Sequence, residues 1–257
     1  MFVATLIEAS LIKKVIESAR ELVTDVNIEF TESGIKFTSM DSAHVALVSV
    51  FLESKSFEKY DYDKEETIGI NLDYLNKILS RVKNKDTLTL KLEKPEFLSV
   101  LYRGSDNYKE TEYKIQLLNI DQEKLNILST EYSVIIDMPS DELKRIFSDQ
   151  NVICETVKMT VEQNKKMVKF TSLGDFNNEC INILKEKEGG FDDEITIKAG
   201  NNINDLFSLK YLLLFTKASS LTHRVQICLE SNMPILIKYE HEQNYIHYYL
   251  APKIDEE

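Results

Sequence analysis

The sequence predicts an α+β protein of two similar domains, each built from two strand–helix–strands repeats with the helices on one face of antiparallel sheets. One sign is a pattern that occurs twice, since Ile-Lys-Phe-Thr-Ser-Met-Asp at 35–41 returns as Val-Lys-Phe-Thr-Ser-Leu-Gly-Asp at 168–175. Another is the spacing of four short amphipathic segments, which open with Ser or Asn and recur every 61 to 69 residues. This regularity indicates an internal duplication into four copies of one unit.

The first copy opens the chain. Its N-terminal segment, 1–8, is typical of a strand, and Ser10 follows as the expected N-cap of a helix over 10–22. A strand is predicted at 45–51, where apolar residues alternate and β-branched residues are frequent. The apolar stripe predicted to lie on the sheet consists of Leu11, Val15, Ala19 and Leu22.

The second copy repeats this arrangement. Asn71 is the expected N-cap of a helix over 71–82, and alternating segments predict strands at 87–92 and 97–101. Its apolar stripe is Leu72, Leu75, Ile78, Leu79 and Val82.

A polar segment at 118–132 has no counterpart in the repeat. We therefore interpret it as a connector between an N-terminal domain, 1–117, and a C-terminal domain, 133–257. The elements predicted after it are a strand at 133–138, a helix at 140–150 capped by Ser140, a helix at 208–218 capped by Ser208, and a strand at 225–230.

Composition excludes several classes of protein. The chain has 257 residues, 43% of them hydrophobic, with no 18-residue apolar stretch and no basic leader, so we expect a soluble, unexported protein that avoids membranes. Cys154, Cys180 and Cys228 form no CxxC pair, which favours reduced cysteines and no metal site. The chain has no phosphate-binding glycine loop, and His241-Glu242 lacks the second helical His of a zinc protease, so we expect no enzyme activity and no cofactor.

The net charge of −12 is unevenly distributed. The four predicted helices hold nine basic and six acidic residues, a net of +3, whereas the rest of the chain holds 22 basic and 37 acidic residues, a net of −15. Four locally basic helices on an acidic body indicate one positive surface that meets an anionic partner. The alternative is that these are ordinary solvated helix faces.

Several motifs along the chain are specific in their order and spacing. They are Ser10-x-x-Lys13-Lys14-Val15, Ser39-Met40-Asp41-Ser42-x-His44-Val45-x-Leu47-Val48, Gly69-x-Asn71-Leu72, Lys77-Ile78-Leu79, Tyr211-Leu212-x-x-Phe215-Thr216-Lys217-Ala218, Met233-Pro234-Ile235 and Tyr248-Tyr249-Leu250-Ala251-Pro252-Lys253-Ile254. Because these motifs occur in this order and spacing, the chain resembles the proliferating cell nuclear antigen family over essentially its full length. Members of this family are the eukaryotic sliding clamps of DNA replication. The resemblance implies the DNA-clamp fold and a nuclear protein of replication and repair.

The resemblance also implies a ring around duplex DNA, made by three subunits joined head to tail, with the helices lining the hole. Lys and Arg on those helices would contact phosphates without reading bases, so the ring could slide. This chain has Ser80 and Ser148 where the family often has further basic residues, and Arg81, Lys144 and Arg145 are the neighbouring basic residues that could compensate. The expected DNA-binding residues are Lys13, Lys14, Arg20, Lys77, Arg81, Arg145, Lys210 and Lys217.

A second implied site is an apolar pocket that docks short peptides of partner proteins. The partners expected from the family are the clamp loader, the replicative DNA polymerase, a flap endonuclease and DNA ligase. An apolar pocket beside an extended tail can hold a helical turn with aromatic anchors. The residues carried over are Met40, His44, Val45, Leu47, Leu125, Ile127, Pro234, Tyr249, Leu250, Ala251 and Pro252.

Ring closure requires strand edges that pair with another subunit. By resemblance, these edges are the strand near 108–117, with Tyr113 and Ile115, and the strand near 179–184, with Ile181 and Ile183. The family's regulated lysine has its nearest equivalent in Lys165, although Lys166-Met167 replaces the usual Asp-Gly turn.

Two other functions stay open from the sequence. One is a subunit of a heteromeric checkpoint-type clamp, which would be a persistent monomer when purified. The other is a protein-only scaffold that never encircles DNA.

Overall fold

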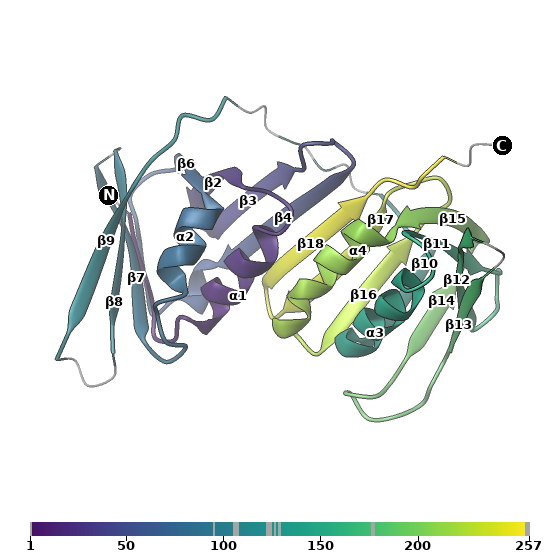
Figure 1. Cartoon of the computed structure of the whole chain (residues 1–257). Helices are drawn as coiled ribbons and strands as arrows, with labels where there is room; N and C mark the ends of the chain where they lie inside the picture. The colour runs from purple at the N-terminus through teal and green to yellow at the C-terminus, as the bar shows by residue number, and fades with distance from the viewer. Residues whose placement is uncertain are drawn as a thin grey trace. The chain divides into compact units, whose positions relative to one another are not determined.

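The computed structural model describes most of the chain (Figure 1). The described residues are 2–94, 96–104, 108–121, 125, 127, 130–175 and 178–254. They form two compact units. Unit 1 comprises Met1–Ser42, Val48–Asn126 and His241–Ile246, and unit 2 comprises Ala43–Leu47, Ile127–Glu240 and His247–Glu257.

Each half of the chain contains nine strands and two α-helices among its described residues. The first half has β1 (Phe2–Leu6), α1 (Ser10–Ala19), β2 (Asp25–Thr31), β3 (Gly34–Met40), β4 (Ala46–Glu53), β5 (Lys59–Tyr62), β6 (Glu66–Asn71), α2 (Leu72–Leu79), β7 (Thr87–Lys94), β8 (Phe97–Arg103) and β9 (Glu110–Gln116). The second half has β10 (Val134–Pro139), α3 (Ser140–Asn151), β11 (Thr156–Val161), β12 (Met167–Leu173), β13 (Glu179–Lys185), β14 (Thr196–Ala199), β15 (Ile203–Ser208), α4 (Leu209–Phe215), β16 (Arg224–Leu229), β17 (Ile235–His241) and β18 (Asn244–Leu250). Short 3₁₀ helices follow β4, at Ser54–Ser56, and α4, at Thr216–Ser220.

The two halves share one strand order. In the first half, β5-β1-β7-β8-β9 and β4-β3-β2-β6 are neighbours in these orders, and in the second half β14-β10-β16-β17-β18 and β13-β12-β11-β15 are neighbours. Adding nine to each label of the first half gives the second half. The pairs are antiparallel, as in β2 with β3 and β11 with β12. The predicted fold class, α+β with two similar domains, is therefore confirmed.

The helices lie in pairs on one face of the sheets. Figure 1 shows α1 beside α2 and α3 beside α4, each pair in front of strands of its own half. In α2, the predicted residues Leu72, Leu75 and Leu79 are fully buried, and Val82 just after the helix is buried as well. Burying such a stripe supplies most of the stability of a short helix.

The stripe predicted for α1 was right at two residues and wrong at two. Val15 and Ala19 are buried as predicted, whereas Leu11 and Leu22 are half-buried, and the other buried residues of the helix are Ile12, Ile16 and Ser18. The physical reason is that the helix turns start at Ala9, which has helical φ and ψ and is completely buried, so the face that meets the sheet is set from that residue.

The same backbone contact opens each of the four α-helices. An amide at the helix start donates to the carbonyl of the residue just before a strand: Ala9 to Asp86, Leu72 to Thr24, Ser140 to His223 and Leu209 to Glu155, over 3.1, 2.7, 2.9 and 2.9 Å. These amides are among the donors that a helix N-terminus leaves unpaired. The contact therefore identifies equivalent positions in the four repeats.

The backbone contact at the helix start also explains why the predicted N-caps were wrong at two helices. Ser10 and Ser140 lie inside α1 and α3, whose N-cap residues are Ala9 and Pro139, and Ser140 Oγ donates to the Thr222 carbonyl instead. Ser208 does occupy the N-cap position of α4, but its side chain makes no cap bond. Asn71 is the N-cap of α2 as predicted, because its Oδ1 accepts from the Tyr74 amide over 3.0 Å.

We predict that Asn71→Ala lowers the free energy of unfolding by about 1 kcal/mol, the usual effect of losing a side-chain cap. Ser208→Ala is the matched control, since Ser208 has the same position without the bond, and it should cost less than half as much. Urea denaturation at one protein concentration measures both. Equal losses in the two variants would contradict a specific role for the Asn71 cap.

Candidate functional site

The basic residues predicted to face DNA differ in exposure. Those on or just after α2, α3 and α4 are exposed, whereas those on α1 are half-buried. The exposed residues are Lys77, Arg81, Arg145, Lys210 and Lys217, and the half-buried ones are Lys13, Lys14 and Arg20. The predicted set is therefore not uniform, and α1 differs from the rest.

Lys13 holds the segment that follows α2. Its Nζ donates to the carbonyl of Val82 and, over 3.1 Å, to Oδ1 of Asn84. Two of the three donors of the ammonium group thus have partners within unit 1. Lys13 can offer one N–H to an outside group.

Arg20 lies at the other end of α1 and is ion-paired. Its Nη1 is 3.1 Å from Oδ1 of Asp73 at the start of α2, and its Nη2 is 3.1 Å from Oε1 of Glu21. The Arg20 side chain is 33% exposed and that of Asp73 45%. Lys13 and Arg20 therefore join α1 to α2 and its following turn at the two ends of the helix pair.

Two tyrosines support lysines on the second helix of each unit. Lys77 Nζ is 5.1 Å from the ring centre of Tyr74, and Lys210 Nζ is 5.8 Å from that of Tyr211. Both distances are in the range of a cation–π interaction. Counted from the equivalent residues Leu72 and Leu209, the two tyrosines occupy the same position but the two lysines do not, so the duplication repeats the tyrosine and not the lysine.

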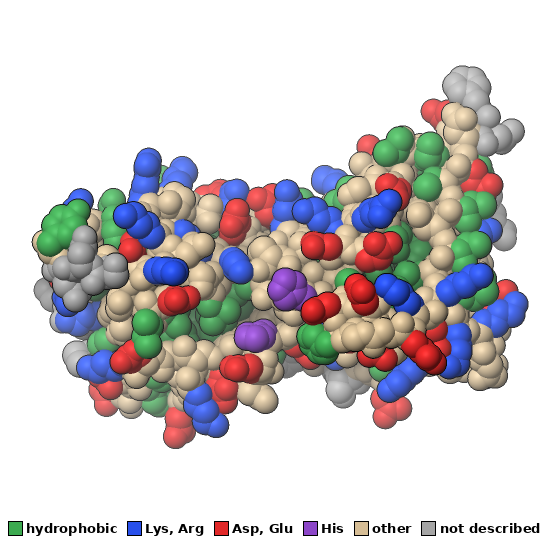
Figure 2. Space-filling model, turned by 90° about the horizontal axis from the view of Figure 1, so that it is seen from below, with side chains coloured by type: hydrophobic (Ala, Val, Ile, Leu, Met, Phe, Trp, Pro, Cys, Tyr) green, Lys and Arg blue, Asp and Glu red, His purple; other side chains and the backbone are tan. Residues whose placement is uncertain are grey.

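The duplication also repeats a basic doublet. Counted from Ala9 and Ser140, the pair Lys13-Lys14 of α1 corresponds to Lys144-Arg145 of α3. Lys144 is exposed and was not in the predicted set, although its equivalence to Lys13 favours it. Elsewhere charges are mixed: Figure 2 shows one face on which Lys and Arg side chains alternate with Asp and Glu.

Most of the predicted docking residues lie in unit 2, where the C-terminal tail is held by backbone pairing. Ala251 N donates to the Val45 carbonyl over 2.9 Å, and Lys253 N to that of Leu206 over 2.8 Å. Val45 is 39% and Ile127 40% exposed, so both aliphatic side chains are accessible to solvent. His44 is exposed, whereas Leu47, Pro234, Tyr249, Ala251 and Pro252 are half-buried.

Three of the predicted docking residues have other surroundings. Leu250 is only 1% exposed, so its side chain belongs to the core of unit 2. Met40 and Leu125 belong to unit 1, and both are half-buried.

Tyr132, for which the sequence pattern gives no signal, is anchored at the end of the predicted connector. Its hydroxyl donates to the Pro234 carbonyl over 3.2 Å. Burial raises the pKa of Tyr132, so the hydroxyl stays protonated and keeps this bond at physiological pH. The next residue, Ser133, donates its amide to Oε2 of Glu230 over 2.9 Å.

The two strands predicted to form the ring contact are both terminal in their sheets. Among the described residues, β9 pairs with β8 alone and β13 with β12 alone. Ile181 and Ile183 on β13 are 45% and 52% exposed, and Tyr113 on β9 is 37% exposed and stacks on Tyr102 with ring centres 6.3 Å apart. Ile115 is largely buried, at 8%.

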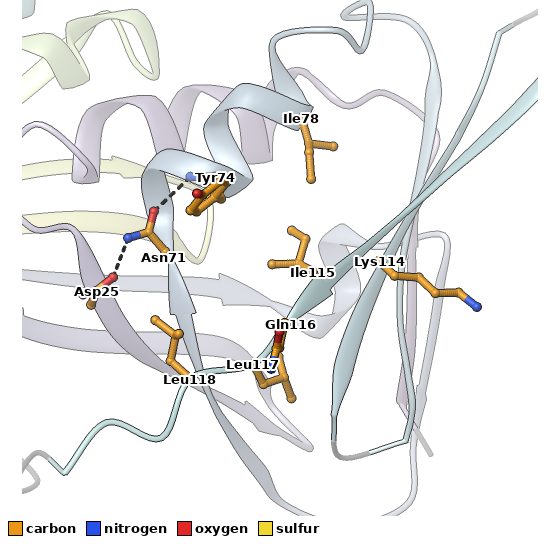
Figure 3. Close-up of a pocket in the computed structure, with 9 residues that line it drawn as sticks. All are labelled: Asp25, Asn71, Tyr74, Ile78, Lys114, Ile115, Gln116, Leu117 and Leu118. Carbon is orange, nitrogen blue, oxygen red and sulfur yellow. Dashed lines mark hydrogen bonds between the residues drawn. The ribbon is translucent and has the colours of Figure 1, made fainter.

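A groove of about 680 Å³ runs between α2 and the end of β9 in unit 1 (Figure 3). In it Ile78 and Ile115 point toward one another, while Lys114 points away. The lining residues are Asp25, Asn71, Tyr74, Ile78, Lys114, Ile115, Gln116, Leu117 and Leu118. The groove is thus continuous with the open edge of β9.

The start of the connector packs against β6 beside this groove. Leu118 N donates to the Gly69 carbonyl over 2.8 Å, and Asn27 Nδ2 to that of Ile120 over 3.1 Å. A Cβ at position 69 would lie 2.3 Å from the Leu118 carbonyl oxygen, so only glycine allows this approach.

Lys165 lies in the turn between β11 and β12. Its amide donates to the Glu162 carbonyl over 3.0 Å, its Nζ forms an ion pair with Glu162, and Asn164 before it has a φ of 60°. Asn tolerates this left-handed conformation well, so Asn164 takes the place of a turn glycine.

Neither a metal site nor a membrane span is found in the part of the chain that the structure describes. No three His, Cys, Asp or Glu side chains are grouped there so that they could bind a metal ion. None of the helices in those residues is both long and apolar enough to cross a bilayer.

Comparison with known proteins matches both halves of the chain. The family model described as proliferating cell nuclear antigen, N-terminal domain, matches residues 1–125, and the model of the C-terminal domain matches residues 126–254. A curated protein of Chaetomium thermophilum named proliferating cell nuclear antigen is 40% identical over 260 residues, which cover 100% of each chain.

Proposed function

Since the chain belongs to the proliferating cell nuclear antigen family, we propose that it is a sliding clamp of DNA replication and repair. Three copies form a ring around duplex DNA and tether DNA polymerase and other enzymes to it. The observation that carries this proposal is the fourfold repeat, whose helical segments lie on one face of the sheets and present exposed Lys and Arg side chains. The protein acts in the nucleus and without catalysis of its own.

The exposed cations support contact with the DNA backbone. Lys77, Arg81, Arg145, Lys210 and Lys217 come from the helical segments of both units, and all are exposed. Lys and Arg that reach phosphates release counterions and bind without reading sequence. Such contacts are individually weak, which suits a ring that must slide.

The open strand edges support closure into a ring. β9 and β13 differ in sequence, so a contact between them joins the head of one chain to the tail of the next. The exposed Ile181 and Ile183 on β13 provide apolar area, and Tyr113 with the adjoining groove provides it on the β9 side. An edge paired in this way no longer invites aggregation.

The tail and connector support a docking site for partner peptides. Val45 and Ile127 offer exposed apolar area, and the tail near Ala251 offers extended backbone. A short peptide with aromatic anchors suits such a surface. Through this site we expect the ring to bind the clamp loader, the replicative polymerase, a flap endonuclease and DNA ligase.

The proposed function is tested by whether the protein is topologically linked to circular DNA. Loaded onto nicked circular DNA by a clamp loader, the protein should stay bound through a high-salt wash and leave when the circle is cut, because a ring around duplex DNA is held by its closure. Gel filtration of the DNA before and after cutting measures retention. Blocking the cut ends with a bulky bound protein is the control, and it should restore retention.

Two results would contradict a ring of three identical chains. Equal loss from intact and cut circles would favour the protein-only scaffold. A purified chain that stays monomeric at every concentration would favour the heteromeric clamp.

We predict that Tyr113→Ala shifts the assembly toward monomer without unfolding it, because Tyr113 presents a large aromatic side chain at the open edge of β9. Truncating a central interface residue costs about 1–3 kcal/mol. Sedimentation velocity over a dilution series measures the shift. Phe191→Ala, which removes a 76% exposed aromatic side chain from a loop, is the control and should leave assembly unchanged; an unchanged Tyr113→Ala assembly would place the interface elsewhere.

We predict that Leu125→Ala with Ile127→Ala weakens binding of a peptide carrying Gln-x-x-aliphatic-x-x-aromatic-aromatic by about 1–3 kcal/mol, since anchor pockets hold most of such binding energy. Isothermal calorimetry measures the affinity. Leu173→Ala, at a 61% exposed residue of β12, is the control and should bind normally. Unchanged affinity in the double variant would mean that the peptide docks elsewhere.

A further inference from the structure

Two acidic side chains contact the guanidinium group of Arg20. Its guanidinium meets Asp73 through Nη1 and Glu21 through Nη2, each at 3.1 Å, so two carboxylates share one cation. Its third nitrogen, Nε, is buried and has no partner among the described residues. Nε is therefore covered by packing while the two Nη atoms make the ion pairs, and the Arg20 side chain as a whole is 33% exposed.

Asp73 is well placed to keep this contact. It lies in the first turn of α2, where the partial positive charge of the helix N-terminus stabilises a carboxylate. A DNA phosphate that approached Arg20 would have to displace Asp73 and then remain close to both Asp73 and Glu21. Like charges at that separation repel, so the local field opposes the exchange.

Unit 2 has a different arrangement at the equivalent positions. Counted from Leu72 and Leu209, whose amides make the same backbone contact, Asp73 corresponds to Lys210. Counted from Ala9 and Ser140, Arg20 corresponds to Asn151. Lys210 is exposed, and no carboxylate pairs with it in the described part of the chain. The acidic neutralisation is thus a property of unit 1 alone.

We propose that Asp73 holds the Arg20 guanidinium in the place of a DNA phosphate, so that Arg20 joins α1 to α2 and adds nothing to DNA binding. This inference rests on the proposed function. It leaves the exposed Lys77 and Arg81, with the half-buried Lys14, as the DNA contacts of unit 1, since two of the three donors of Lys13 are occupied as well.

The test is the salt dependence of binding to a linear duplex, measured by fluorescence anisotropy on the assembled protein. Each phosphate contact contributes about 0.9 to the slope of log K against log salt. Lys77→Ala should lower the slope by about that amount for each contacting chain, whereas Arg20→Ala should leave it unchanged. In the Asp73→Asn background the slope should be steeper, and there Arg20→Ala should lower it.

The Asp73→Asn background distinguishes a specific effect of Asp73 on Arg20 from a general change of surface charge. Asp73→Asn removes a negative charge in any case, but only release of Arg20 makes the effect of Arg20→Ala depend on residue 73. Asn has the shape of Asp, so the fold is retained, and circular dichroism with sedimentation checks this.

The outcomes distinguish the two proposals. If Arg20→Ala lowers the slope as much as Lys77→Ala in the natural background, the inference is overturned while the DNA surface stands. If Arg20→Ala has no effect in the Asp73→Asn background, Asp73 does not mask Arg20 and the inference is likewise overturned. If neither Lys77→Ala nor Arg20→Ala changes the slope, α2 does not contact DNA, so the DNA surface proposed for unit 1 falls together with the inference.

Discussion

One backbone contact, made four times, organises this molecule. At the start of each α-helix an amide donates to a carbonyl that immediately precedes a strand, as Ala9 does to Asp86 and Leu209 does to Glu155. The bond satisfies a donor that the helix cannot pair internally and also fixes where the helix begins relative to a neighbouring strand. Because the same contact recurs, the four helices begin at equivalent places relative to their sheets. Their buried residues therefore fall at equivalent positions when counted from the donor amide.

The surface chemistry follows from this placement. A helix whose inner face is fixed by buried residues such as Leu75 or Leu212 has an outer face that is free to vary. On that outer face the two units have diverged: one has Asp73 paired with Arg20, and the other has an exposed Lys210. The duplicated scaffold therefore carries unequal charge, and equivalence of fold does not extend to equivalence of surface.

The sequence predicted the architecture better than the contacts. The repeated pattern and the helix spacing were enough for the fold class, because both reflect the period of the elements. The N-caps predicted at Ser10 and Ser140 were wrong because the amides at the starts of these helices, Ala9 N and Ser140 N, bind backbone carbonyls instead. Those carbonyls belong to Asp86 and His223, which are far away in the sequence. For the same reason the sequence could not show that Arg20 meets Asp73, 53 residues on, whereas the exposure of Lys77 and Lys217 agrees with their position outside the apolar stripes.

The predicted connector, 118–132, is attached by hydrogen bonds near both ends, so its unattached stretch is shorter than the whole segment. Hydrogen bonds attach it to unit 1 at Leu118 and Ile120 and to unit 2 at Tyr132, so 11 residues, 121–131, separate the last two attachments in the sequence. The entropy of closing a loop changes slowly with its length, by about 0.6 kcal/mol for each doubling. Stability therefore places little restriction on how many residues this stretch contains.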